Sequence, residues 1–371
     1  MRHATVRSIK YPSSAGINVL LTSVGRRGYL VNYFKEAIGA RGSVIATNSH
    51  PDTTGMIAAD IAFVVPRANE PGFIDSLLEI CSRYSVKLLM SLHDWEAPFI
   101  AARRESFLRA GTFPAVSDPG VIETCLDKWA TVAFARRMGW STPETFVSLA
   151  AAREALDAGL LRFPVILKPR RGQGSVAIEV VHDLSELESQ YALLAGKVPR
   201  MDSNGIMLLD KDEPLVIQQY IQGVDYDLEV VNDLDGQYVS VMAKKKFSSR
   251  GGECELAETV EEQRLTDLGR DIGSRMGHLG VLDIDVVERD GTLYVLEFNP
   301  RFGGCYPFSH MAGANLPAAY VAWALGEKPD PLWLRARAGV KCFKDFSFVL
   351  DERNKTILED VNKAEVEKIL Y

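Results

Sequence analysis

Residues 281–301 constrain the fold more than any other segment, and they read V-L-D-I-D-V-V-E-R-D-G-T-L-Y-V-L-E-F-N-P-R. Residues 281–288 and 292–298 are rich in Val, Ile, Leu and Tyr, and the pair Asp290-Gly291 separates them. Two such runs around an Asp-Gly pair predict a β-hairpin. Side chains then alternate between the two faces of each strand.

The predicted hairpin carries Asp285 on one strand and Glu297 and Asn299 on the other. Asp285 lies opposite Glu297 only if the loop has an odd number of residues centred on Gly291, because a two-residue turn puts them on opposite faces. We expect the odd loop, since a carboxylate buried alone is costly. Two or three hard oxygen ligands, with positions left for water and phosphate, suit Mg²⁺ that arrives with a nucleotide. The alternative is a hairpin whose two carboxylates face solvent.

A second motif is F-P-V-I-L-K-P-R-R-G-Q-G-S-V, residues 163–176. A short apolar strand ends in Lys168 and runs into a loop that carries Gly172, Gly174 and Ser175. Glycines let backbone N–H groups approach phosphates closely, and Lys168 adds a point charge. The spacing is that of neither a P-loop nor a dinucleotide fingerprint. An ordinary basic hairpin turn is the alternative.

Two further segments suit a nucleotide. Lys128 opens a predicted helix, and lysines on separate elements hold a polyphosphate from two sides; alone, it would be a surface residue. Residues 214–226, P-L-V-I-Q-Q-Y-I-Q-G-V-D-Y, predict an apolar strand and then an extended turn at Gly223. Such a segment presents backbone donors and acceptors to an adenine edge, and Asp225 suits ribose hydroxyls.

The first part of the chain alternates strands and helices. Residues 17–24 and 43–48 predict strands on either side of a helix that begins near Tyr29, and residues 86–92 predict a third strand. This alternation is typical of a parallel α/β sheet.

Polar side chains follow two of these strands. Asp94 and Glu96 come after the strand at 86–92, and the carboxyl ends of parallel strands are where such sheets bind ligands, so we expect both to meet substrate. Arg26 and Arg27 lie at the first strand-helix turn, where backbone donors and the helix dipole favour an anion. One of them is expected to anchor a substrate carboxylate, with a solvated surface pair as the alternative.

The segment K-K-K-F-S-S-R-G-G-E, residues 244–253, is interpreted as a basic, glycine-bearing loop. Lys246 or Arg250 is expected to steady a triphosphate or an acyl phosphate. The alternative is a solvated run of charges.

Composition agrees with an enzyme that acts on small molecules. The 371 residues suggest two or three domains, and 47% apolar and 25% charged residues are ordinary for a soluble globular protein. A formal charge of −7 argues against broad nucleic-acid binding. Five scattered cysteines without C-x-x-C spacing fit reduced thiols in a cytoplasmic protein.

The two ends of the chain show no site chemistry. Residues 1–16 are polar and basic without an apolar run, which predicts a flexible leader and not a secretory signal. Residues 312–326, the longest small-apolar stretch, are too short to span a bilayer, so no membrane partner is expected. The tail after about residue 335 predicts strands followed by a short amphipathic helix.

The order of these motifs resembles the ATP-grasp superfamily across roughly residues 116–305. Within it, the chain looks most similar to single-unit proteins related to the carbamoyl-phosphate synthase large subunit, whose second ATP-grasp half is absent here. The resemblance implies mixed α/β and α+β architecture: an ATP-grasp fold preceded by a Rossmann-like, parallel-sheet pre-ATP-grasp domain. The implied organisation is a leader at 1–16, a pre-ATP-grasp domain at 17–115, ATP-grasp subdomains at 116–215 and 216–335, and an extension at 336–371.

The resemblance also implies a role for each matching residue. Lys128 and Lys168 would contact the phosphates of ATP and the loop from Gly172 to Ser175 would close over them. Asp285, Glu297 and Asn299 would hold one or two Mg²⁺ ions, with Mn²⁺ as a substitute, and Arg301 would face the acyl phosphate. The implied adenine hinge and ribose ligand are Gln218, Gln219, Tyr220, Ile221 and Asp225. Relatives often have an acidic residue at the position of Gln218 or Gln219, and Glu at that of Asp225, so base and ribose recognition depart from the family pattern.

The implied activity is an ATP-dependent ligase that activates a carboxylate as an acyl phosphate and joins it to an amine, with ADP and phosphate as products. No covalent protein nucleophile is needed. Its partners would be a small-molecule carboxylate and amine, and a homodimer is expected from the family. One alternative is a carbamoyl-phosphate-type kinase that stops at the acyl phosphate. The other is a non-catalytic ATP-binding module, which would not need the metal ligands together with Arg301.

Overall fold

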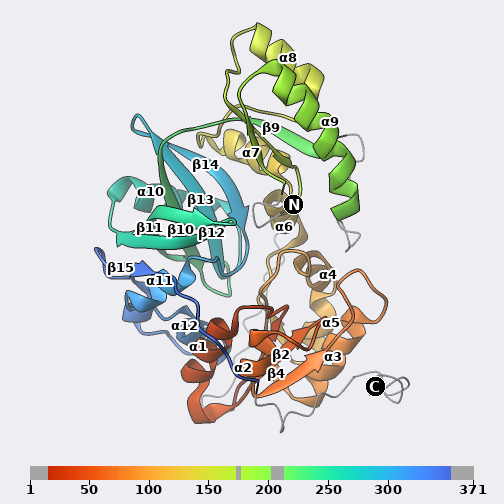
Figure 1. Cartoon of the computed structure of the whole chain (residues 1–371). Coiled ribbons are helices and arrows are strands. Elements are labelled where there is room, and N and C mark those ends of the chain that lie inside the picture. Colours follow the sequence, from red (N-terminus) through yellow and green to blue (C-terminus); the bar gives the residue numbers. More distant parts are fainter. Residues whose placement is uncertain (1–15, 173–176, 202–212, 352–371) are drawn as a thin grey trace, which may run out of the picture.

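The computed structural model describes residues 16–172, 177–201 and 213–351, and all structural statements below concern these residues (Figure 1). Residues 1–15 of the predicted leader at 1–16, the loop residues Gly174 and Ser175, and the predicted C-terminal helix lie outside them. In the described ranges, no helix has the length and apolar character needed to cross a bilayer.

The N-terminal part is a parallel five-stranded sheet in the order β3-β2-β1-β4-β5. A buried apolar run forms each central strand, which confirms the α/β prediction. The strand β3 was missed by the sequence analysis. The elements are β1 (Asn18–Thr22), α1 (Gly28–Ile38), η1 (Gly39–Arg41), β2 (Val44–Asn48), α2 (Thr54–Ala58), β3 (Ile61–Val64), α3 (Phe73–Arg83), β4 (Val86–Ser91), α4 (Ala97–Ala102), α5 (Arg104–Arg109) and β5 (Phe113–Pro114).

Two helices lead from this sheet to a small antiparallel sheet in the order β6-β9-β7-β8. Asp127 caps the second helix, because its carboxylate accepts from the N–H groups of Trp129 (2.9 Å) and Ala130 (3.4 Å). This cap places Lys128 at the first helical position, as predicted. The elements are α6 (Pro119–Leu126), α7 (Lys128–Met138), β6 (Thr145–Phe146), α8 (Leu149–Asp157), β7 (Val165–Pro169), β8 (Glu179–Val181), α9 (Leu184–Met201) and β9 (Leu215–Gln219).

The remaining strands form a six-stranded antiparallel sheet in the order β14-β13-β10-β11-β12-β15. In Figure 1 the small sheet is at the top and the parallel sheet at the bottom, and the six-stranded sheet lies between them on the left. Its elements and helices are β10 (Val224–Asn232), β11 (Tyr238–Arg250), β12 (Glu253–Val260), α10 (Gln263–Met276), β13 (Val281–Arg289), β14 (Thr292–Asn299), α11 (Tyr306–Met311), α12 (Leu316–Ala324), η2 (Pro331–Leu334) and β15 (Lys341–Phe343).

The prediction that residues 244–253 form a loop is wrong. Strand β11 continues to Arg250, and only Gly251 and Gly252 form the turn before β12. Both turn glycines have positive φ, 56° and 78°. The alternation of Lys244 and Lys246 with neighbouring side chains matches strand periodicity, which the high charge of the segment concealed.

One apolar core connects the parallel sheet to the C-terminal elements. Leu21, Val31 and Phe34 pack in the same cluster as Phe302 and Tyr320, and all five are almost completely buried. Each buried side chain of this size contributes about 1.5–3 kcal/mol. The core therefore fixes the β1–α1 turn against the segment that follows β14.

Gly280 offers a test of this packing. Its φ is +66°, and a Cβ there would lie 1.9 Å from the hydroxyl oxygen of Tyr320, which accepts from the Val281 N–H at 2.6 Å. Gly277 also has positive φ, +75°, but open space around it. We expect Gly277→Ala to cost about 1–2 kcal/mol of unfolding free energy from backbone strain alone. Gly280→Ala should cost about 1–3 kcal/mol more because of overpacking. Chemical denaturation measures both, and equal losses would contradict the packing described.

Candidate active site

The metal-ligand hairpin forms by a different route from the one predicted. Asp290 and Gly291 make a two-residue turn with φ of 51° and 81°, so the prediction of an odd-numbered loop is wrong. Asp285 nevertheless pairs with Glu297, because a β-bulge shifts the register between Val286↔Val295 and Asp285↔Glu297. The bulge adds one residue to β14 and returns both carboxylates to one face.

Lysines from two other elements hold these carboxylates. Lys246 Nζ lies 2.6 Å from Asp285 Oδ1, and Lys128 Nζ lies 3.4 Å from Glu297 Oε1. Lys128 also donates to the carbonyl oxygen of Gly172 at 2.8 Å. Helix α7, the glycine segment after β7 and strand β14 therefore meet at one point. Arg250 instead lies at the exposed end of its hairpin.

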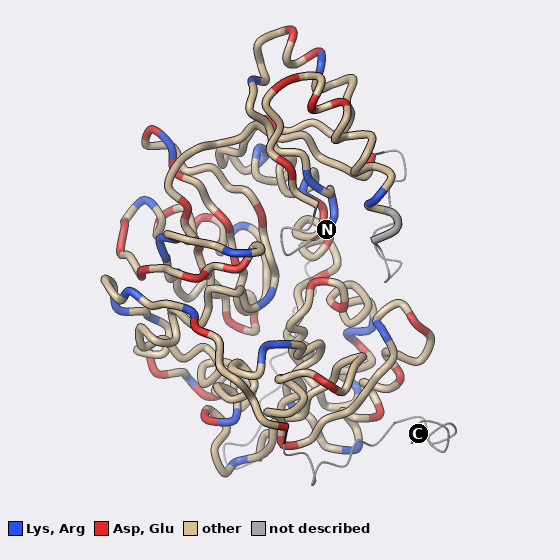
Figure 2. The backbone as a smooth tube through the Cα atoms, in the orientation of Figure 1, with Lys and Arg blue, Asp and Glu red and all other residues tan. Residues whose placement is uncertain are grey.

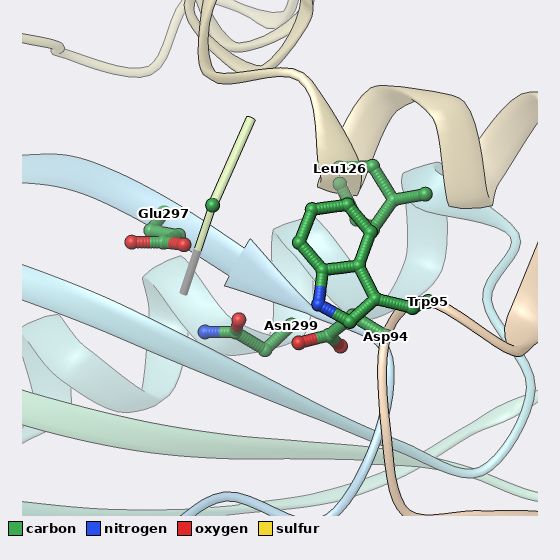
Figure 3. A pocket seen from close by; sticks show the side chains of 7 residues that line it. Asp94, Trp95, Leu126, Glu297 and Asn299 are labelled. Atoms are coloured by element: carbon green, nitrogen blue, oxygen red, sulfur yellow. The ribbon is translucent and has the colours of Figure 1, made fainter. Parts of the chain in front are cut away.

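Glu297 and Asn299 line a pocket together with residues from three other segments (Figure 3). The indole of Trp95 lies between Leu126 and Asp94 in the close-up, with Asn299 beside Asp94. The lining residues are Asp94, Trp95, Cys125, Leu126, Gly172, Glu297 and Asn299. The pocket thus brings together the end of β4, the end of α6, the glycine segment and β14.

The donor set fits a hard divalent cation by its chemistry. Asp285 and Glu297 supply carboxylate oxygens from adjacent strands, and Asn299 supplies an amide oxygen. In the described part of the chain, no three His, Cys, Asp or Glu side chains converge in metal-binding geometry. A cation held here would therefore take its other ligands from nucleotide phosphates or water.

Lys168 is buried at the end of β7. Burial, and then the nearby charge of Lys128, lower the pKa of Lys168 to about 8. A phosphate next to it favours the charged form, so the pKa rises when the anion binds. Anion binding must therefore take up a proton at pH values above about 8.

This pKa predicts a pH-dependent affinity for ATP. The affinity should be level below pH 8 and then fall by up to about tenfold per pH unit, because binding must protonate Lys168. Titration calorimetry in buffers of different ionisation enthalpy measures both the affinity and the proton uptake. Lys168→Met removes the titrating group, so its weaker affinity should not change over this range. A level affinity in the wild-type protein would contradict the placement of Lys168 at the phosphates.

Arg301 joins the hairpin to the N-terminal sheet. Its Nε donates to Asp94 Oδ2 at 3.0 Å, and its Nη2 donates to Asn299 Oδ1 at 3.1 Å. Asp283 Oδ2 lies 3.8 Å from Nη1. These contacts fix the guanidinium at the rim of the pocket, between residues more than 200 positions apart in the sequence.

The structure separates the two arginines of the first turn. Arg26 is 85% exposed at its side chain and pairs with Glu253 at 2.9 Å. Arg27 is half-buried, and its Nη1 donates to the carbonyl oxygen of Phe302 at 2.8 Å. Burial and then the charge of Arg301 lower the pKa of Arg27. Arg27 and Arg301 therefore lie close together at the C-terminal edge of the parallel sheet, with the carboxylates of Asp94 and Asp283 beside them.

Asp94 and Glu96 have different surroundings. Asp94 lines the pocket, whereas Glu96 is buried among hydroxyl groups. Its carboxylate accepts from Ser23 Oγ at 2.5 Å, from Ser91 Oγ at 3.2 Å, and from Thr22 Oγ1. Burial raises the pKa of Glu96. Glu96 therefore holds the ends of β1 and β4 together. It does not line the pocket, in contrast to the prediction that it meets substrate.

In the predicted adenine segment, the glutamine side chains hold neighbouring strands. Gln218 Nε2 donates to Thr145 Oγ1 at 2.9 Å, and Gln219 Oε1 accepts from the Arg162 N–H at 3.1 Å. The Tyr220 N–H donates to the carbonyl oxygen of Pro164 at 3.3 Å. Both glutamine side chains and the N–H groups of Gln219 and Tyr220 therefore already have partners within the protein. Asp225 lies exposed on β10.

Sequence reasoning missed a buried charge cluster on strands β10 and β11. Lys244 Nζ lies 2.8 Å from both Asp227 Oδ1 and Glu229 Oε1, and all three side chains are buried. Burial alone would lower the pKa of Lys244, but the two carboxylates reverse this and raise it. Figure 2 shows Lys, Arg, Asp and Glu interspersed along the six-stranded antiparallel sheet. The alternating acids of β10 were the available signal, because they share one face.

Two family models match the chain. Residues 19–115 match the PylC-like N-terminal domain. Residues 211–345 match the description "ATP-grasp in the biosynthetic pathway with Ter operon". The first match coincides with the parallel sheet, and the second contains the large sheet and the candidate metal ligands.

Curated relatives are longer proteins. The chain is 25% identical over 248 residues to the carbamoyl phosphate synthase large chain of Mesorhizobium japonicum, which covers 58% of this chain and 21% of that relative. It is 22% identical over 295 residues to the corresponding chain of Gemmatimonas aurantiaca, and this match covers 76% of this chain and 25% of that relative. The chain thus spans about a quarter of the length of these relatives or less.

Solved structures share the fold at low identity. An L-amino acid ligase from Bacillus licheniformis has a TM-score of 0.63 and 20% identity, covering 87% of this chain and 78% of its own. N5-carboxyaminoimidazole ribonucleotide synthetase from Thermus thermophilus has a TM-score of 0.63 and 16% identity, and the match covers 87% of this chain and 81% of the synthetase. A third structure is the biotin carboxylase domain dimer of the Hydrogenobacter thermophilus 2-oxoglutarate carboxylase, in complex with MgADP, ADP and bicarbonate. It has a TM-score of 0.65 and 16% identity, and the match covers 84% of this chain and 70% of the carboxylase chain. Residues 19–115 therefore match a PylC-like N-terminal domain, residues 211–345 match an ATP-grasp domain, and these solved structures share the fold over most of the chain.

Proposed function

We propose that this protein is an ATP-dependent ligase. It transfers the γ-phosphoryl group of ATP to a substrate carboxylate and joins the resulting acyl phosphate to an amine, with ADP and phosphate released. The observation that carries the proposal is the pocket where the end of β4, the glycine segment and the carboxylate hairpin meet. The fold similarity to an L-amino acid ligase and a ribonucleotide synthetase supports the same reaction class.

In this proposal, lysines bind the triphosphate from two sides. Lys128 and Lys168 lie on α7 and β7, and each is near Glu297, so phosphates between them would also meet the metal ligands. Mg²⁺, or Mn²⁺ in its place, would be held by Asp285, Glu297 and Asn299 and would neutralise charge on the phosphate oxygens. Lys246, now paired with Asp285, would turn toward the phosphates when that carboxylate binds the cation.

Adenine and ribose would lie between the small sheet and β10. The backbone near Ile221 would recognise the base, because both glutamine side chains and the N–H groups of Gln219 and Tyr220 already have partners. Asp225 would accept from the ribose hydroxyls. Gly172 would approach the phosphates at the start of the glycine loop, whose residues Gly174 and Ser175 lie outside the described part.

The substrate carboxylate would bind near Arg27 and Arg301. Arg301 is fixed by Asp94 and Asn299 at the pocket rim, where it would stabilise negative charge on the transferring phosphoryl group. Arg27 would hold a carboxylate of the substrate. The amine then attacks the acyl carbon, the carbon–oxygen bond to phosphate breaks, and the amine loses a proton.

Arg27→Ala should raise the KM for the carboxylate substrate by about tenfold or more, through the loss of a charged hydrogen bond worth about 1.5–3 kcal/mol. Arg26→Ala is the matched control, because Arg26 is exposed and paired with Glu253. Initial rates at varied carboxylate concentration separate the two variants. Equal KM values would place the carboxylate elsewhere.

The experiment that tests the function is a screen of amino acids and other carboxylates, with and without amines, for release of ADP, AMP and phosphate from Mg²⁺-ATP. ADP and phosphate that depend on both substrates support the ligase, and Lys168→Ala should abolish the signal. AMP release would refute the acyl-phosphate route.

The similarity to carbamoyl phosphate synthase large chains favours a second candidate, a kinase that stops at a small acyl or carbamoyl phosphate. ADP release without an amine, together with a phosphorylated product, would identify it. ATP binding without turnover against the whole panel would favour a non-catalytic module.

We further propose that the protein acts in the cytoplasm as a homodimer on small molecules. The free thiols described suit a reducing compartment, and one structural neighbour is named as a domain dimer. Light scattering of the purified protein measures the dimer, and a monomer mass at micromolar concentration would contradict it.

A further inference from the structure

Three of the five cysteines lie in one small cluster next to the buried charges. Cys254 on β12 and Cys305 at the start of α11 pack with Ala257 and Phe308, and Cys342 on β15 packs against them. All three have free thiols. The sequence separates Cys254 from Cys305 by fifty residues, and the fold brings them together.

Within the cluster, Cys254 and Cys305 are direct partners. Cys254 and Cys305 lie close enough that each thiol shifts the pKa of the other, and the Cys254 Sγ donates to the carbonyl oxygen of Leu256 at 3.4 Å. Cys342 pairs across the strands with Ala257, three residues beyond Cys254. At about 3.4 Å per residue, this offset separates Cys254 from Cys342 by roughly 10 Å, too far for a disulfide without backbone movement.

The surroundings favour a reactive sulfur at Cys254. The neighbouring Cys305 thiol is the main cause that lowers the pKa of Cys254, and the charge of Lys246 acts in the same direction. Burial and the charge of Asp227 oppose this change. Cys254 is also next to the exposed turn at Gly251 and Gly252, so a small oxidant need cross little protein to reach it. Cys254 is itself buried, with 5% of its surface exposed, and the nearby charge of Lys246 favours the thiolate form that oxidants attack.

We propose that Cys254 and Cys305 form a reversible redox site, in which a hydroperoxide converts the two thiols to a disulfide. The Cys254 thiolate attacks a peroxide oxygen, the O–O bond breaks, and with hydrogen peroxide one water leaves and a sulfenic acid remains. The Cys305 sulfur then attacks the Cys254 sulfur, so the S–S bond forms and a second water leaves. Two thiols are oxidised and one peroxide is reduced, and an added dithiol reverses the reaction.

The bond would act on the active site through the segment that ends at Cys305. Arg301 lies four residues before Cys305, and Gly303 between them packs so closely that a Cβ there would lie 2.0 Å from Asp283 Oδ1. A disulfide brings two sulfurs to about 2.05 Å, closer than two thiols that only pack against each other. The oxidised segment must therefore shift, and displacement of a catalytic group by about 1 Å lowers turnover by up to about a hundredfold. This effect on turnover rests on the proposed ligase function.

The test uses the full-length reduced protein. It is treated with hydrogen peroxide, blocked with iodoacetamide and mapped by peptide mass spectrometry. The expected product is a Cys254–Cys305 linked peptide that disappears with dithiothreitol. Cys81 and Cys125 are internal controls, because burial raises the pKa of both and they lie in other core clusters.

Variants make the assignment specific. Cys342→Ser should still form the link, whereas Cys254→Ser and Cys305→Ser should not. Linkage of either sulfur to Cys342, free Cys254 after oxidation, or irreversible oxidation without a link would overturn the site. These outcomes need no turnover, so they stay distinct from failure of the ligase proposal. Undiminished ADP release by the oxidised, substrate-responsive protein would overturn the effect on activity while leaving the bond in place.

Discussion

Replacing Glu297 with Gln should lower substrate-dependent ADP release by about a hundredfold or more while ATP binding persists. The change keeps the shape of the side chain and removes its charge. Glu297 lines the pocket, pairs with Lys128 at 3.4 Å and lies opposite Asp285, so in the proposed mechanism its charge would hold the cation at the phosphates. The lysines still attract ATP in this variant. Stopped assays of ADP, together with calorimetry of ATP binding, separate the two effects.

Glu288→Gln is the matched control for this prediction. Glu288 lies on the same hairpin, but it accepts from the Gly291 N–H at 2.8 Å, near the turn and away from the pocket. Its turnover should stay within about twofold of the wild type, as for surface substitutions generally. Equal turnover rates in the Glu297→Gln and Glu288→Gln variants would show that Glu297 has no catalytic role.

Arg301→Ala should have an effect of similar size, about a hundredfold to a thousandfold in turnover, because a fixed cation at the developing charge is lost. It should also lower stability, since Asp94 and Asp283 lose a buried partner. Arg301→Lys separates these causes. It keeps the charge and much of the stability, but it cannot donate to Asp94 and Asn299 in a fixed plane, so turnover should still fall by about tenfold or more.

Thermal unfolding and kcat are measured on the same preparations. Arg289→Ala is the control, because Arg289 pairs only across the exposed turn with Asp290 among the contacts described. If Arg301→Lys turned over as fast as the wild type, Arg301 would be a structural link between the two sheets and not a catalytic group.

Local sequence patterns predicted the secondary structure better than they predicted the contacts between side chains. The alternation of apolar runs and helices gave the parallel sheet, and the Asp290-Gly291 pair gave the hairpin. Face-sharing of Asp285 and Glu297 was expected for an incorrect reason, because the bulge in β14 depends on packing that the sequence does not display. The short strand β3 escaped because its four residues carry little periodic signal.

Long-range contacts explain the remaining differences. Arg26 and Arg27 are adjacent in sequence, and only the fold turns the second toward Phe302 and leaves the first in solvent. Glu96 meets three hydroxyl groups from the ends of β1 and β4, which no spacing predicts. The Asp94–Arg301 contact joins residues of separate sheets. Such contacts become visible only when tertiary packing is known.

The most direct measurement follows oxygen atoms from the substrate carboxylate that supports ADP release. The carboxylate is labelled with ¹⁸O, and the released phosphate is examined by ³¹P NMR. Transfer of the γ-phosphoryl group to the carboxylate, followed by amine attack, predicts one ¹⁸O atom in each phosphate. Phosphate without ¹⁸O would show that water attacks ATP directly, and it would contradict the acyl phosphate at the centre of the proposed mechanism.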